Sequence, residues 1–193
     1  MNEKQIILAS SSPRRIEMMK ENGINPIIIP PDVSENLPET IGPKDAVLFL
    51  ALKKALAVEE SAIQMGLTNG EIIIAADTVV FLDSIIGKPQ NEKEAFKILK
   101  DLCGKMHFVM TGVAILKSGK SDREVFYETT KVFFKSYTDD QIIEYIHTNE
   151  PYDKAGGYAI QGAWGKYVDH IEGDYHNVIG FPWKRILNHL QKF

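Results

Sequence analysis

Residues 71–78 read Glu-Ile-Ile-Ile-Ala-Ala-Asp-Thr, and this stretch decides the fold. The run 71–76, apolar from Ile72 onward, is typical of a strand that is buried on both faces of a sheet. Asp77 and Thr78 follow directly, where the strand is expected to end. Because open α/β sheets bind ligands beyond the carboxyl ends of their strands, the stretch predicts a helix-covered sheet and makes Asp77 a candidate for chemistry.

Strands and helices alternate on either side of this run. A short apolar strand is expected at 5–9, a helix at about 14–22 that begins with Ser12-Pro13, and a long helix at 44–65 whose apolar positions recur every three or four residues. In the second half, long strands at 107–117 and 124–134 form an antiparallel pair. The predicted class is therefore α/β with a mixed sheet and flanking helices.

Shorter elements complete this prediction. They are a strand at 25–30, a loop at 30–43, a hairpin of 79–82 with 85–86, a helix capped by Asn91 that ends at Gly104, a helix from Thr138 to about His147, strands near 166–171 and 177–179, and a last helix from Trp183. The two cap assignments rest on Glu94 and Gln141, each three residues after its cap.

Length and composition exclude several classes of protein. The 193 residues suit one domain, 1–193, and 22 Lys and Arg against 26 Asp and Glu give a net charge of −4, which argues against a nucleic-acid polymer as partner. The longest apolar run, 46–52, is too short to cross a membrane. A single cysteine, Cys103, permits no internal disulfide, so a cytoplasmic location is expected.

The junction at 10–15, Ser-Ser-Ser-Pro-Arg-Arg, is the first candidate anion site. A helix N-terminus offers free N–H groups to a phosphate, and arginines add bidentate contacts. The alternative is an ordinary capped surface helix. Asp77 is a candidate general base or metal ligand, and its alternative is a turn residue.

The segment 150–162 contains glycines and Gln161 where packing gives no motive for them. Glycine allows close approach to a ligand, and a glutamine amide offers the donors and acceptor that read a base edge. The alternative is a twisted, bulged strand. Lys88, between Gly87 and Pro89, is held on a constrained loop, whereas Glu35 and Lys54 carry no signal beyond that of solvated side chains.

Taken in order, these segments resemble the Maf family of nucleotide pyrophosphatases. The resemblance covers nearly the whole chain and rests on 10–15, on Ala-Asp-Thr at 76–78, on Lys-Pro at 88–89, on 150–162 and on Asn-Val-Ile-Gly-Phe-Pro at 177–182. It implies an ITPase-like mixed sheet with a deep cleft between two lobes. It also implies hydrolysis of dTTP and UTP to the monophosphate and pyrophosphate, assisted by Mg²⁺ or Mn²⁺, and an association with septum formation and arrest of cell division.

The resemblance also implies roles for single residues. Asp77 is the catalytic carboxylate, Glu35 its partner at the metal site, and Arg14, Thr78 and Gln161 mark the dTTP and UTP subgroup. The expected phosphate or catalytic contacts are Ser10, Arg15, Lys54, Lys88 and Lys154. Two alternatives stay open: a nucleotide-binding regulator of cell division without catalysis, and a house-cleaning pyrophosphatase for ITP or modified nucleotides. A homodimer is the commonest expectation for such an enzyme.

Overall fold

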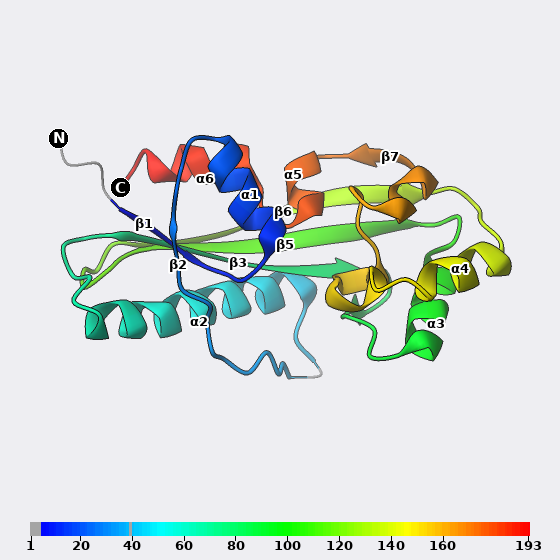
Figure 1. Ribbon diagram of the computed structural model, residues 1–193, viewed down its shortest axis with the longest axis horizontal. Coiled ribbons are helices and arrows are strands. Elements are labelled where there is room, and N and C mark those ends of the chain that lie inside the picture. The colour runs from blue at the N-terminus through cyan, green and yellow to red at the C-terminus, as the bar shows by residue number, and fades with distance from the viewer. Residues whose placement is uncertain (1–4, 39) are drawn as a thin grey trace. The chain divides into compact units, whose positions relative to one another are not determined.

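The computed structural model describes residues 5–38 and 40–193 (Figure 1). Its elements are β1 (Ile6–Ala9), α1 (Pro13–Glu21), β2 (Ile27–Ile28), α2 (Pro43–Gln64), β3 (Ile72–Phe81), β4 (Ile85–Ile86), α3 (Glu92–Leu102), β5 (Met106–Lys117), β6 (Arg123–Phe134), α4 (Asp139–Ile146), three short 3₁₀ helices (Pro151–Asp153, Ala155–Gly157 and Ala163–Tyr167), β7 (Val168–Glu172), α5 (Tyr175–Ile179) and α6 (Trp183–Leu190).

The strands form one mixed sheet in the order β2-β1-β3-β5-β6-β7, with β4 paired to β3. Both β2 and β3 run parallel to β1, whereas β4 is antiparallel to β3 and β7 is antiparallel to β6. The predicted α/β class with a mixed sheet and flanking helices is confirmed. None of the helices within the described residues is long and apolar enough to cross a membrane.

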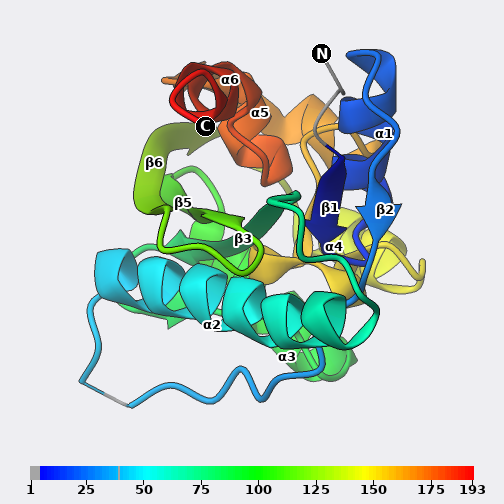
Figure 2. The same cartoon turned by 90° about the vertical axis from the view of Figure 1, so that its left-hand side faces the viewer.

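The chain divides into two compact units, and the first comprises the described residues within 1–77, 111–127 and 180–193. In this unit α2 covers one face of the strands, and α1 and α6 lie on the other side (Figures 1 and 2). The core between α2 and the strands is built from small and branched side chains, among them Ala51, Ala55 and Val58 of the helix and Ile7 and Ile73 of the strands. Small helix residues let the helix approach closely, and Gly112 of β5 permits the closest contact, because a Cβ there would lie 2.2 Å from the carbonyl oxygen of Val47.

The second unit comprises 78–110 and 128–179. Here α3 packs against α4, and both cover an aromatic core that includes Phe134, Tyr137, Tyr158 and Trp164. Both predicted caps are confirmed, since Asn91 accepts from the backbone of Glu94 and Thr138 forms a capping box with Gln141. That the two units make a single domain stays a prediction.

One predicted element in this unit is wrong. The strand expected near 177–179 is the helix α5. The carboxylate of Asp174 accepts from the backbone N–H of His176, a local bond that favours a helical start over an extended chain. Asn177, fully buried, then donates to the Val109 carbonyl and to the Thr130 hydroxyl, and these two bonds hold the helix in place.

Candidate active site

Asp77 lies inside β3 rather than after its end. The prediction that the strand stops at residue 76 is wrong, because the apolar run resumes at Val79 and the last two strand residues pair with β4. The residue is 7% exposed, so its carboxylate is buried. A carboxylate in the middle of a buried strand is costly unless a cation accompanies it.

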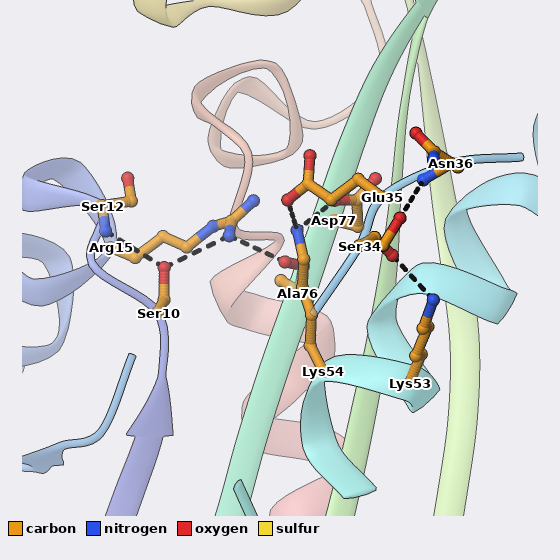
Figure 3. Close-up of polar contacts among 10 residues, drawn as sticks. All are labelled: Ser10, Ser12, Arg15, Ser34, Glu35, Asn36, Lys53, Lys54, Ala76 and Asp77. Atoms are coloured by element: carbon orange, nitrogen blue, oxygen red, sulfur yellow. Dashed lines mark hydrogen bonds and ion pairs between the residues drawn. The ribbon is translucent and has the colours of Figure 1, made fainter. Parts of the chain in front are cut away.

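Lys54 supplies that cation. From α2 its ammonium lies 2.6 Å from a carboxylate oxygen of Asp77 and 2.6 Å from one of Glu35 (Figure 3). The side chains of Lys54 and Asp77 are each 10% exposed, whereas that of Glu35 is 50% exposed. Lys54, for which the sequence favoured a solvated position, therefore joins a buried carboxylate to one that is open to solvent.

The loop that carries Glu35 is fixed to the same helix. Lys53, the neighbour of Lys54, donates to the backbone carbonyl of Ser34 at 2.7 Å, and the hydroxyl of Ser34 accepts from the backbone of Asn36 at 3.3 Å (Figure 3). Two successive lysines of α2 thus hold the loop at its backbone and at its carboxylate. The fold brings together Glu35, Lys54 and Asp77 from three separate segments of the chain.

Arg15, near the start of α1, is a second cation close to Asp77 (Figure 3). Its guanidinium donates to the hydroxyl of Ser10 at 3.3 Å, to the carbonyl of Ala76 at 2.7 Å and to the carbonyl of Gly180 at 2.9 Å. Burial lowers the pKa of Arg15 to about 10, and the negative charge of Asp77 opposes that shift. The guanidinium stays charged at neutral pH, so it adds positive potential beside Asp77.

The start of α1 has the predicted residues in the predicted places. Ser12 occupies the N-cap and Pro13 the first helical position, but the Ser12 side chain makes no capping bond. The backbone N–H of Ser12 donates to the hydroxyl of Ser10 at 3.1 Å, so this hydroxyl accepts from both Ser12 and Arg15. The buried Nε of Arg14 has no hydrogen-bond partner among the described residues, which leaves a donor that a ligand oxygen would satisfy.

The remaining predicted residues belong to the second unit. Thr78 is half-buried in β3, and Lys88 and Gln161 are exposed. The ammonium of Lys154 contacts the Asp153 carboxylate and donates to the backbone carbonyl of Glu150 at 2.7 Å. The structure therefore ties Lys154 to its own loop.

The two loops of the second unit that carry these lysines are joined. The backbone N–H of Gly156 donates to the carbonyl of Gly87 at 3.0 Å, beside Lys88. Gly156 has a φ of +74°, and a Cβ there would lie 2.7 Å from Val80, so glycine is required for both its conformation and its packing. The bulged strand considered for this segment is not formed, and 3₁₀ turns take its place.

Sequence reasoning missed Glu150 as a functional candidate. Its carboxylate accepts from the Tyr145 hydroxyl at 3.0 Å and from the backbone N–H of Ala163 at 3.2 Å. The sequence did contain two signals: Glu150 begins the segment 150–162, and Gly162 follows Gln161, where a glycine between two turns often marks a close approach.

Comparison with known proteins finds relatives that match nearly the whole chain. The family described as Maf-like protein matches residues 5–193. A dTTP/UTP pyrophosphatase of Caldicellulosiruptor bescii is 44% identical over 98% of this chain and 94% of its own length, and one of Bacillus cereus is 44% identical over 100% and 91%. A solved HAM1 protein from Coxiella burnetii is similar over 68% of this chain and 73% of its own, with 19% identity and a TM-score of 0.46. The match over nearly every residue, together with these two relatives, shows that the chain belongs to the Maf family.

Proposed function

We propose that this protein hydrolyses dTTP and UTP to the nucleoside monophosphate and pyrophosphate. The observation that carries the proposal is the buried carboxylate of Asp77, held at 2.6 Å from the ammonium of Lys54 and close to the guanidinium system of Arg15. The names of the relatives support the substrate, since both are dTTP/UTP pyrophosphatases.

The reaction needs a water that attacks the α-phosphorus and positive charge that stabilises the leaving pyrophosphate. We assign the water to Asp77, which orients it or accepts its proton, a role typically worth about 10²–10⁴ in rate. Positive charge beside this carboxylate comes from Lys54 and Arg15, and we assign Arg14 to the phosphates. The other proposed phosphate contacts are Ser10, Lys88 and Lys154.

A divalent cation, Mg²⁺ or Mn²⁺, is part of this proposal. The described residues contain no group of three or more His, Cys, Asp or Glu side chains that could hold a metal. Glu35 and Asp77 nevertheless contact one ammonium, so their oxygens lie in a common cluster. Two carboxylates suit Mg²⁺, which usually takes one or two together with water and substrate phosphates. When bound there, the metal would neutralise charge on the phosphates.

We assign the choice of base to Gln161, with Thr78 and Arg14 as the other residues of the dTTP and UTP subgroup. The Gln161 amide can accept from N3–H and donate to O4, the edge that thymine and uracil share. Gln161 is exposed and makes no hydrogen bond to a described residue, so its donors and acceptor are available. Replacing Gln161 with Glu removes the donor, and we expect the preference for dTTP over CTP to fall. An unchanged preference would remove Gln161 from base reading.

The first experiment is to incubate the protein with each common NTP and dNTP plus Mg²⁺ or Mn²⁺ and to measure pyrophosphate against orthophosphate. We expect pyrophosphate from dTTP and UTP, a loss of about 10²-fold or more in Asp77→Asn, and no loss in Asp83→Asn, an exposed residue between β3 and β4. Circular dichroism checks that both variants fold.

Other results would contradict the proposal in distinct ways. Near-normal turnover in a folded Asp77→Asn variant would remove Asp77 from the mechanism. Activity mainly on ITP would favour the house-cleaning alternative. Nucleotide-dependent stabilisation without pyrophosphate release would favour a regulator that only binds. A cytoplasmic location, a homodimer and a connection with septum formation stay predictions.

A further inference from the structure

We propose that Glu150 is a positioning residue for substrate selection, which holds the turn that presents Gln161. The proposal rests on the proposed function, in which Gln161 reads the base. Glu150 follows α4, and its carboxylate lies under the turn: one oxygen accepts from the Tyr145 hydroxyl of α4 at 3.0 Å and the other from the backbone N–H of Ala163 at 3.2 Å. Both carboxylate oxygens are thus used, one toward the helix and one toward the turn.

The backbone at Gly162 lies directly against the carboxylate of Glu150. A Cβ built on Gly162 would lie 1.8 Å from Oε1 of Glu150, so no residue except glycine fits there without displacing the carboxylate. Gly162 is the residue directly after Gln161. Glu150 and Gly162 therefore act together: the carboxylate of Glu150 holds the backbone directly after Gln161, whose amide reads the base.

Two further contacts hold the backbone around Gln161. A backbone bond spans Gln161, because the N–H of Gly162 after it donates to the carbonyl of Ala159 before it at 3.1 Å. After it, Trp164 is 1% exposed, and its ring stacks on that of Tyr145 with centroids 4.5 Å apart. Gln161 itself is exposed. A rigid support with one exposed polar side chain is what recognition of a base edge requires, because a loose backbone would let the amide pair with either edge pattern.

The charge of Glu150 matters as well as its shape. Burial raises the pKa of Tyr145, and the adjacent carboxylate raises it further, so the phenol stays a hydrogen-bond donor. The backbone N–H of Ala163 is also a donor, and the carboxylate accepts from both with its negative charge. The Gln side chain keeps the shape, and the Tyr145 hydroxyl can turn to accept from its NH₂ group, but the side chain is neutral. Replacing Glu150 with Gln therefore removes the charge from these bonds while leaving the backbone carbonyl that accepts from Lys154.

The test measures kcat/KM for UTP and for CTP and takes their ratio. We expect Glu150→Gln to lower the ratio about tenfold, the effect of replacing charge-assisted hydrogen bonds with neutral ones. Tyr145→Phe removes only a hydroxyl and should lower the ratio less, which keeps the test open if Glu150→Gln does not fold. Glu144→Gln, an exposed glutamate of α4, is the matched control and should leave the ratio unchanged.

A double-mutant cycle separates positioning from a merely structural role. If Glu150 acts through Gln161, Glu150→Gln should no longer change the UTP to CTP ratio once Gln161 is replaced with Ala. Equal losses on both nucleotides in folded Glu150→Gln and Tyr145→Phe would overturn the proposal while leaving base reading by Gln161 intact. If Gln161→Ala itself leaves the ratio unchanged, base reading fails and the proposal for Glu150 fails with it.

Discussion

His107 should make the stability of the protein depend on pH in mildly acidic solution. The residue lies in β5, is fully buried, and shares a hydrogen bond of 2.6 Å between its Nε2 and the Tyr158 hydroxyl. Its Nδ1 has no hydrogen-bond partner among the described residues. Burial lowers the pKa of His107 from 6.5 to about 4, because the imidazolium loses its hydration in the aromatic core.

The sign and the size of the effect follow from proton linkage. Between about pH 6.5 and pH 4 the unfolded chain binds a proton at this residue and the folded protein does not, so acid favours the unfolded state. The stability is complete above the unfolded pKa of 6.5 and is lost progressively as the pH falls toward about 4. A difference of about 2.5 between the two pKa values, at about 1.36 kcal/mol for each, corresponds to about 3 kcal/mol.

Urea unfolding at a series of pH values measures this loss. Other groups also titrate in this range, so the quantity to compare is the free energy of unfolding of the natural protein minus that of His107→Gln. We expect this difference to fall by about 3 kcal/mol between about pH 7.5 and pH 4. His147→Gln, at an exposed histidine that caps α4, should show no such fall. Parallel curves for the natural protein and His107→Gln over the whole range would refute the reasoning.

Two further predictions concern the first unit. Replacing Lys54 with Met strands the Asp77 carboxylate, which is 10% exposed, so we expect the free energy of unfolding in urea to fall by about 3 kcal/mol. Adding Asp77→Asn to Lys54→Met should lower the free energy of unfolding little further. A loss well below about 1 kcal/mol in Lys54→Met alone would show that Lys54 and Asp77 are not a buried ion pair. Gly112→Ala places a Cβ 2.2 Å from the backbone oxygen of Val47, which cannot turn aside, so a loss of more than about 3 kcal/mol is expected. Gly42→Ala, with nothing within 4 Å of its Cβ, is the control, and similar losses in both would contradict the close approach.

Local signals in the sequence predicted local structure well. The caps at Asn91 and Thr138 are formed, because a cap depends only on residues three positions apart. The end of β3 was misplaced for the opposite reason: Asp77 looks like a strand terminator until its partner is known, and Lys54 lies 23 residues earlier in the chain. The partner of Asp77 is set by the packing of α2 against the sheet, which no short window of sequence contains.

The same limit applies to the two adjacent arginines, because the sequence does not show which groups each one contacts. Successive helix residues point in directions about 100° apart, so Arg14 and Arg15 cannot share one environment. Arg15 donates to the carbonyls of Ala76 and Gly180, and it thereby joins the start of α1 to β3 and to the segment before α6. Arg14 has a buried Nε without a partner among the described residues. A donor without an acceptor is costly to bury, whereas a donor with three acceptors is part of the framework. We therefore propose Arg14 as the arginine that contacts a substrate oxygen, and Arg15 as the arginine that ties the start of α1 to β3 beside Asp77.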